Sequence, residues 1–140
     1  LIEKKITKKT KVIMPVHLTG RMCEMDKINK IAKKYNISVI EDSAQSIMSG
    51  FKNKMSGSWG EVGCFSTHPL KNLNASGDGG FLTTNNKKIY QAAKNLRSHG
   101  MEEDRNNVKN FGFVSRMDNL QAKILNFNLL DWFKYSARNI

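Results

Sequence analysis

The sequence predicts an α/β fold with a mainly parallel sheet covered by helices, and two observations support this prediction. An apolar run at residues 11–16, an amphipathic stretch at 24–35 and a second apolar run at 39–40 follow one another directly. Strand, helix and strand in this order form a βαβ unit, whose two strands are parallel. Further strand-like and helix-like segments follow in the second half of the chain.

The helices are predicted from apolar spacing and from residues that cap helix ends. The stretch 24–35 has apolar residues at helical spacing and ends at Asn36. Asn85 or Asn86 can cap a second helix, whose end is marked by Arg97, His99 and Gly100. Asp118 can cap a third helix that runs to about residue 133.

The remaining segments are predicted as strand ends, turns and one loop. Strands are expected at 39–40, running into Glu41 and Asp42, and at 64–66 and 81–84, and a tight turn at 77–80 precedes the last of them. The glycines between residues 50 and 63 indicate turns and close backbone approaches, and 101–110 reads as a polar loop.

Composition limits the function classes without choosing one. The 140 residues carry a formal charge of +11, much of it on lysines near the N-terminus without interleaved aromatic residues. We therefore interpret these lysines as a solvated surface and expect neither nucleic acid nor a membrane as a partner. Two cysteines without disulfide spacing indicate a reducing compartment, here the cytoplasm. The chain is expected to be one domain or part of one, and a fragment of a longer protein because it opens at Leu1.

Two places in the sequence can carry chemistry. Asp42 follows a predicted strand, and ligands of open parallel sheets bind beyond the carboxyl ends of strands. Glu41, Asp42 and Ser43 could equally be a helix cap, whereas a carboxylate here could also pair with a cationic ligand atom.

The second place is the segment 66–72, which lies between a strand end and a glycine-rich turn. Ser66 and Thr67 offer hydroxyl groups to a phosphate, and Lys71 offers a primary amine. A lone lysine is usually a surface charge, and His68 alone is more often structural than a base or a metal ligand. No second His or Cys stands at metal spacing, so no metal site is predicted.

Other polar features have structural readings. Gly77 to Gly80 is better explained as a turn than as a phosphate loop. His17 follows the first strand and either faces the site or has a structural role, and His99 belongs to a helix end.

Together these segments resemble one family. The strings PVHLTGRMCEMDKI, VIEDSAQS, GSWGEVGCFSTHPLKNLNASGDGG, LRSHG and SRMDNLQAKIL are similar, in order and spacing, to the DegT/DnrJ/EryC1/StrS family of nucleotide-sugar aminotransferases, which use pyridoxal 5'-phosphate (PLP). The resemblance covers roughly residues 11–130. It implies the aspartate-aminotransferase-like fold, known as fold type I, with residues 1–140 as the central and C-terminal part of the PLP-binding large domain. The family's upstream part and C-terminal small domain are expected to be absent from this chain.

The resemblance also implies residue roles. Lys71 matches the lysine that holds PLP as a Schiff base and then moves the proton during transfer. Asp42 matches the aspartate that pairs with the pyridinium nitrogen, and Gln45 the residue near the ring hydroxyl. Ser66 matches the phosphate-binding hydroxyl. His68 and Asn72 flank the lysine as positioning or substrate-contacting residues.

One segment departs from the family pattern G-[FY]-N-x-R-[LM]. Residues 112–117 read GFVSRM, so Val114 replaces the usual asparagine while Arg116 is retained. In the family this segment crosses a dimer interface towards the neighbouring cofactor or substrate. The resemblance therefore implies a homodimer with shared active sites, in which Arg116 contacts an anionic group and one amide contact is lost.

The implied function is transfer of an amino group from an amino acid, expected to be L-glutamate, to a keto group of a nucleotide-linked deoxysugar. Such products enter surface glycans or glycosylated metabolites, and the fragment alone is expected to be inactive. Three alternatives remain open: a dehydratase relative, which would carry histidine in place of Lys71; a non-catalytic basic binding module; and a PLP-binding protein without transferase activity.

Overall fold

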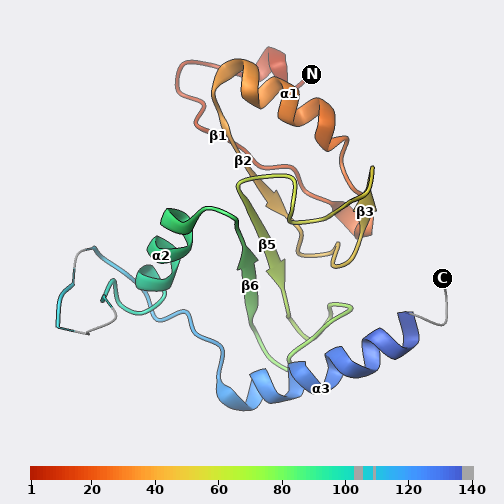
Figure 1. The fold of residues 1–140 in the computed structure, drawn as a ribbon, viewed down its shortest axis with the longest axis vertical. Helices are drawn as coiled ribbons and strands as arrows, with labels where there is room; N and C mark the ends of the chain where they lie inside the picture. Colours follow the sequence, from red (N-terminus) through yellow and green to blue (C-terminus); the bar gives the residue numbers. More distant parts are fainter. Residues whose placement is uncertain (103–105, 109, 137–140) are drawn as a thin grey trace.

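The computed structural model describes residues 1–102, 106–108 and 110–136, which Figure 1 shows as a small sheet with helices around it. The chain begins with a 3-10 turn, η1 (Glu3–Lys5), followed by strand β1 (Val12–Ile13) and a second 3-10 turn, η2 (Leu18–Gly20). Helix α1 (Met25–Tyr35) and strand β2 (Ser38–Asp42) complete the first unit. Since β1 and β2 pair in parallel, with Ile13 opposite Val39, the predicted βαβ unit is confirmed.

The main sheet has four strands in the order β1-β2-β5-β6. Strand β5 (Val62–Ser66) pairs in parallel with β2, so that Asp42 lies opposite Cys64. Strand β6 (Gly80–Thr83) runs antiparallel to β5, with Gly80 opposite Ser66. The sheet is therefore mainly parallel, as the sequence predicts, with an antiparallel strand at one edge.

The first strand is shorter than the predicted run 11–16, and Pro15 explains the difference. Proline has no N–H group, so it cannot continue the ladder as a donor. Its carbonyl still accepts the N–H of Asp42 at 2.9 Å. Pairing resumes at an isolated bridge between Val16 and Asp42. The chain after β1 thus stays beside the end of β2.

The glycine-containing stretch 50–63 holds a hairpin that the sequence did not predict. Strands β3 (Gly50–Phe51) and β4 (Lys54–Met55) pair antiparallel around Lys52 and Asn53. Both of these turn residues have positive φ, 45° and 62°, which is the geometry of a tight type I′ turn. The sequence did not predict this turn because it has Lys-Asn where such turns usually have Asn-Gly.

The apolar core lies on one face of the sheet, under α1. Met25, Ile28 and Ala32 of α1 are buried against Val39 of β2. Phe51 of the hairpin and Trp59 pack at the edge of this core, with ring centroids 5.6 Å apart. Helix α1 ends at Asn36, whose left-handed φ of 53° confirms the predicted stop.

The opposite face of the sheet is open within the described residues. Side chains alternate along a strand, so Ile40 and Asp42 point away from the core that Val39 enters. Met14 and Leu82 are 62% and 42% exposed, and Cys64 on this face is also exposed. The open face therefore combines apolar side chains with the Asp42 carboxylate.

Two further helices complete the described fold. Helix α2 (Lys87–Leu96) begins at Asn86, whose side chain accepts the N–H groups of Lys88 and Ile89 at 2.9 and 3.3 Å. Of the two asparagines that could cap this helix, Asn86 is thus the one that does. Helix α3 (Asn119–Ser136) lies beyond the carboxyl end of β5 (Figure 1). The predicted loop 101–110 falls partly outside the described residues, and its described part includes a bridge from Met101 to Val108.

Candidate functional site

Three of the predicted site residues lie at the carboxyl edge of the sheet. Asp42 ends β2 and Ser66 ends β5, and these strands are parallel neighbours. Asp42 lies opposite Cys64, and Ser66 follows two residues later on the same face of β5. The loop that begins after Ser66 carries Lys71. The two strands therefore bring a carboxylate, a hydroxyl group and the lysine-bearing loop to the same edge.

Asp42 is half-buried, and a backbone N–H group two residues later holds its carboxylate. Its Oδ1 accepts the N–H of Ala44 at 3.0 Å, and its carbonyl accepts the N–H of His17 at 3.0 Å. Partial burial raises the pKa of the neighbouring Cys64 thiol, and the negative charge of Asp42 raises it further. The negative charge of Asp42 thus acts on the neighbouring strand at the open face. There the carboxylate can also pair with a cationic ligand atom.

Gln45 lies on the turn after Asp42, with its side chain exposed. Its Oε1 accepts the N–H of Thr19 at 3.0 Å, from the 3-10 turn η2. Because the amide oxygen binds the backbone, the amide NH₂ group is directed away from Thr19 as a donor. This orientation suits a hydrogen bond to a ligand oxygen.

Residues 67–79 connect β5 to β6 and form the lysine loop, whose two ends are joined by a hydrogen bond. Thr67 donates its N–H to the carbonyl of Gly79 at 2.9 Å and accepts the N–H of Ala75 at 2.9 Å. Ser66 Oγ accepts the N–H of His68 at 3.2 Å, and Lys71 donates its backbone N–H to the carbonyl of His68 at 2.9 Å. Lys71 is half-buried at the end of this turn. The loop is thus a defined structure that can place an amine.

Helix α3 holds this loop from outside. Asn128 Nδ2 donates to the carbonyl of Asn74 at 2.9 Å, and Gln121 Nε2 donates to the carbonyl of Asp78 at 3.1 Å. Gln121 Oε1 also accepts the N–H of Asp118 at 3.3 Å, in the manner of a capping box. The predicted helix start at Asp118 is thus accompanied by contacts to the lysine loop that the sequence did not reveal.

His68 and Asn72 differ in their surroundings. His68 Nδ1 accepts the N–H of Leu70 at 3.1 Å, and its Nε2 lies 3.8 Å from Asp78 Oδ1. These contacts stay within the loop, so they stabilise the turn that carries Lys71. Asn72 is exposed beside the lysine.

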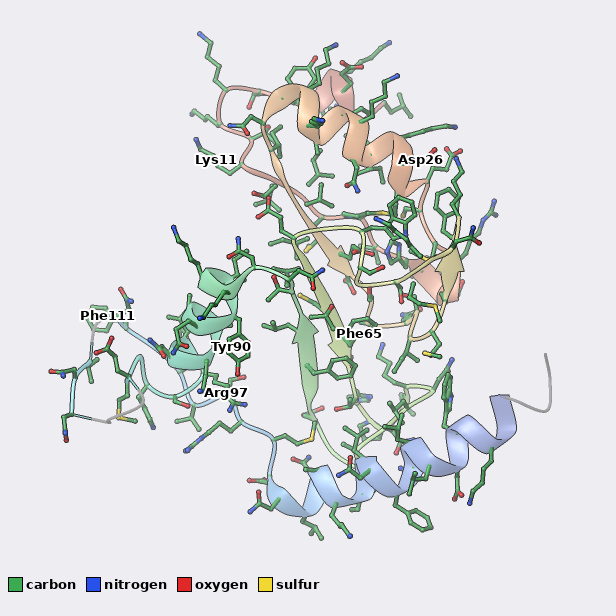
Figure 2. All side chains as sticks on the ribbon, viewed as in Figure 1. Lys11, Asp26, Phe65, Tyr90, Arg97 and Phe111 are labelled. Carbon is green, nitrogen blue, oxygen red and sulfur yellow. The ribbon has the colours of Figure 1, made fainter. Side chains whose placement is uncertain are left out.

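Arg116 lies among a different set of side chains. It lines a cavity of about 460 Å³ together with Arg97 and His99, near the end of α2. Asp42, Ser66 and Lys71 do not line that cavity. Figure 2 shows Tyr90 on α2, Arg97 directly after the end of that helix, and Phe111 on the loop beyond it. Arg116 therefore shares this cavity with Arg97 and His99.

His17 does not face the site. It is fully buried and its Nε2 lies 3.0 Å from Glu41 Oε2, on the covered side of the sheet. The structural alternative for His17 is therefore correct, whereas Glu41, which the sequence suggested as part of a helix cap, is the centre of a buried network. No short motif joins these two residues, because they are 24 positions apart.

The described residues contain neither a metal-binding cluster nor a membrane-spanning helix. No group of three His, Cys, Asp or Glu side chains that could hold a metal ion occurs among them. None of the helices, within the same residues, is long and apolar enough to cross a membrane.

The residues present fit PLP. Asp42 offers a half-buried carboxylate on an open face, and Lys71 lies on the loop at the same edge. Thr67 Oγ1 is buried without a hydrogen-bond partner in the described part of the chain, so this hydroxyl group can still donate to a ligand. Carboxylate, amine and hydroxyl donors match the ring nitrogen, aldehyde and phosphate of the cofactor.

The mainly parallel sheet with helices around it is the α/β architecture expected of fold type I enzymes. The model of the DegT/DnrJ/EryC1/StrS aminotransferase family matches residues 1–139. The chain therefore belongs to this family.

Individual relatives agree with the family match. The chain is 42% identical, over 89% of its length and 33% of the relative's, to UDP-N-acetyl-3-dehydro-α-D-glucosamine 3-aminotransferase of Acidithiobacillus ferrooxidans. It is 48% identical, over 91% of its length and 35% of the relative's, to dTDP-3-amino-3,6-dideoxy-α-D-galactopyranose transaminase of Aneurinibacillus thermoaerophilus. The structure of NtdA from Bacillus subtilis with bound cofactor PMP superposes with a TM-score of 0.80 at 39% identity, covering 89% of this chain and 28% of that one. The chain spans about a third of the length of the curated relatives it matches.

Proposed function

We propose that the full-length protein containing residues 1–140 is a PLP-dependent aminotransferase that moves an amino group from L-glutamate to a keto group of a nucleotide-linked deoxysugar. The observation that carries this proposal is the meeting of Asp42, Ser66 and the Lys71 loop at one edge of the sheet. The two curated relatives above are named for a UDP-linked and a dTDP-linked sugar, which supports the substrate class. The products would enter surface glycans or glycosylated metabolites.

Residues 1–140 would form the central and C-terminal part of the large domain. The rest of the polypeptide would supply the upstream part and the small domain, because the chain spans only about a third of its relatives. The open face beside Asp42 is consistent with this division, since apolar side chains such as Met14 remain exposed there. The fragment alone would then bind the cofactor weakly and would not turn over.

Different residues would bind the different parts of the cofactor. PLP supplies an aldehyde that takes up amino groups and a ring that withdraws electrons from the bonded carbon. The Asp42 carboxylate would hold a proton on the ring nitrogen, and the Gln45 NH₂ group would donate to the ring hydroxyl. Ser66, with Thr67 beside it, would bind the phosphate through hydroxyl and backbone donors.

Lys71 would act through its Nζ. This amine would hold the cofactor through its aldehyde, and it would serve as the group that takes up and returns a proton at the reacting carbon. The loop hydrogen bonds of His68 would position this amine, and the exposed Asn72 would contact substrate beside it.

Arg116 would serve a neighbouring subunit. It lines a cavity with Arg97 and His99. In a homodimer with shared sites, this arginine would meet an anionic group of the partner's cofactor or substrate. Val114 brings an apolar side chain to the position where the family has an amide, so Arg116 would act there without that contact.

The cytoplasm is the proposed location. Nucleotide-linked sugars and amino-acid donors are metabolites of that compartment, and Cys23 and Cys64 are free thiols, which suits a reducing environment. We propose neither nucleic acid nor a membrane as a partner.

Three rival functions make different predictions. A dehydratase of this family would carry histidine at position 71, and the lysine found there argues against it. A basic binding module would bind DNA without PLP, and that binding would weaken steeply with salt. A PLP-binding protein without transferase activity would bind the cofactor and form no product.

The test of the proposal is amino transfer by the full-length protein. The protein with PLP, L-glutamate and nucleotide-linked keto sugars should release 2-oxoglutarate and form an aminated sugar. Lys71→Ala should abolish transfer, whereas Lys123→Ala, on the exposed side of α3, should leave it unchanged. Parental turnover by Lys71→Ala would overturn the proposed mechanism.

A further inference from the structure

Glu41 and Asp42 are consecutive residues of β2 that point to opposite faces of the sheet. The Asp42 carboxylate lies on the open face, whereas Glu41 is fully buried on the covered face. A buried carboxylate costs free energy unless hydrogen bonds replace its water. The surroundings of Glu41 therefore indicate what its side chain does.

The Glu41 carboxylate accepts four hydrogen bonds. Its Oε1 accepts the N–H groups of Trp59 and Gly60, both at 2.7 Å. Its Oε2 accepts the N–H of Gly57 at 2.9 Å and lies 3.0 Å from His17 Nε2. Four donors match the acceptor sites of one carboxylate ion, so the segment 57–60 forms a cradle around this side chain.

His17 joins the same network to the chain after β1. Its Nδ1 accepts the N–H of Cys23 at 3.2 Å, so the ring hydrogen is on Nε2 and is donated to Glu41. Its backbone N–H is donated to the carbonyl of Asp42 at 3.0 Å. One residue thus contacts the side chain of Glu41 and the backbone of Asp42.

The network fixes the strand end from which Asp42 projects. The N–H of Asp42 is donated to the carbonyl of Pro15 at 2.9 Å, and the N–H of Ser43 to the carbonyl of Cys64 at 2.8 Å. Loss of the Glu41 carboxylate would leave three backbone donors of the cradle and His17 without their acceptor. The segments that hold Asp42 would then shift, because buried donors seek new partners.

We propose that Glu41, with His17 as its side-chain partner, is a positioning residue that sets the Asp42 carboxylate against the ring nitrogen of PLP. This inference rests on the proposed function. Glu41 touches neither cofactor nor substrate, and it acts through the backbone of Asp42 and through the segments 15–17 and 57–60. Its effect should therefore be specific to the ring nitrogen.

The experiment compares two cofactors on the full-length apoprotein. PLP has the ring nitrogen, whereas 1-deaza-PLP has a carbon in its place and is otherwise alike. Dissociation constants for both are measured by absorbance titration in the parent protein, Glu41→Gln, His17→Leu and His17→Gln. Glu61→Gln is the matched control, because Glu61 is an exposed carboxylate close to the cradle.

Glu41→Gln should weaken PLP by about tenfold, as expected for a displaced charge-assisted hydrogen bond, and leave 1-deaza-PLP nearly unchanged. His17→Leu should show the same selectivity to a smaller extent, since three backbone donors remain on Glu41. His17→Gln should recover most of the affinity, because its amide can still donate to the carboxylate. Glu61→Gln should bind both cofactors as the parent does.

Equal weakening of both cofactors, or of neither, would overturn the proposal and leave Glu41 with a structural role alone. If circular dichroism shows that Glu41→Gln does not fold, His17→Leu decides by the same criterion. Asp42→Asn separates this inference from the proposed function. If Asp42→Asn shows no loss of affinity selective for PLP, the proposed role of Asp42 is wrong. If Asp42→Asn shows that selective loss and Glu41→Gln does not, only the inference about Glu41 is wrong.

Discussion

Asp42 and Cys64 face each other across two parallel strands, and their chemistry is coupled. Burial is the larger cause that raises the pKa of the Cys64 thiol, and the Asp42 carboxylate is the second. The thiolate is the form that reacts with alkylating agents. The exposed Cys64 is therefore a reporter of the charge at position 42.

Cys64 should react with iodoacetamide more slowly than a free cysteine near neutral pH, since a raised pKa lowers the thiolate fraction. Asp42→Asn removes a negative charge, so the Cys64 pKa should fall and its rate at fixed pH should rise. Peptide mass spectrometry across a pH series measures this rate. Cys23 is the internal control, because only burial raises its pKa and its rate should stay constant. An alkylation rate of Cys64 that is unchanged in Asp42→Asn would contradict the placement of these two side chains on the same face of the sheet.

The segment 57–60 shows how closely one loop can approach a strand. A Cβ atom on Gly60 would lie 2.6 Å from the carbonyl oxygen of Val39, and one on Gly50 would lie 4.0 Å from that of Lys54. The first distance is too short for any side chain, whereas the second is ordinary contact.

Gly60→Ala should therefore lower the free energy of unfolding by about 1–3 kcal/mol, the usual range for overpacking. Gly50→Ala should be close to neutral. Urea unfolding of both variants checks this prediction. Equal stability of the two would mean that the cradle around Glu41 is looser than the structure shows.

At the scale of elements, α3 and the lysine loop form one unit. Asn128 and Gln121 bind the carbonyls of Asn74 and Asp78, one on each side of Gly77. The helix thus holds the return half of the loop, and the hydrogen bonds of Thr67 hold its start. Lys71 lies between these two fixed ends.

Asn128→Ala should destabilise the protein by about 1 kcal/mol, because a half-buried hydrogen bond is lost. The amide of Ala75, which is bonded to Thr67, should also exchange faster with deuterium. Asn126→Ala, exposed on the same helix, should change neither quantity. Hydrogen exchange and urea unfolding measure the two effects, and faster exchange in the control would indicate a general loosening of α3.

Over the whole molecule, the sequence predicted the elements and the open edge of the sheet better than it predicted the contacts between elements. The sequence could predict the site residues Asp42, Ser66 and Lys71, because each lies at or just after a strand and parallel strands end at one edge of the sheet. The pairs His17 with Glu41 and Asn74 with Asn128 are 24 and 54 residues apart. Such pairs depend on tertiary packing and leave no local pattern. The β3 and β4 hairpin was missed because Lys-Asn is an unusual pair for its turn.

The assembly gives a further prediction. If Arg116 serves the partner's site, Lys71→Ala and Arg116→Ala homodimers should each be inactive in the full-length protein. Mixed dimers of the two variants should recover activity, since one of their two sites has both residues intact. Turnover assays before and after subunit exchange measure this. No recovery in verified mixed dimers would place Arg116 in its own subunit's site.

The most direct test of the central claim is to identify the lysine that holds the cofactor. The full-length protein is loaded with PLP, reduced with borohydride, digested and mapped by mass spectrometry. The account predicts one pyridoxyl label, on Lys71, and none at this position in Lys71→Ala. A label on any other lysine would contradict it.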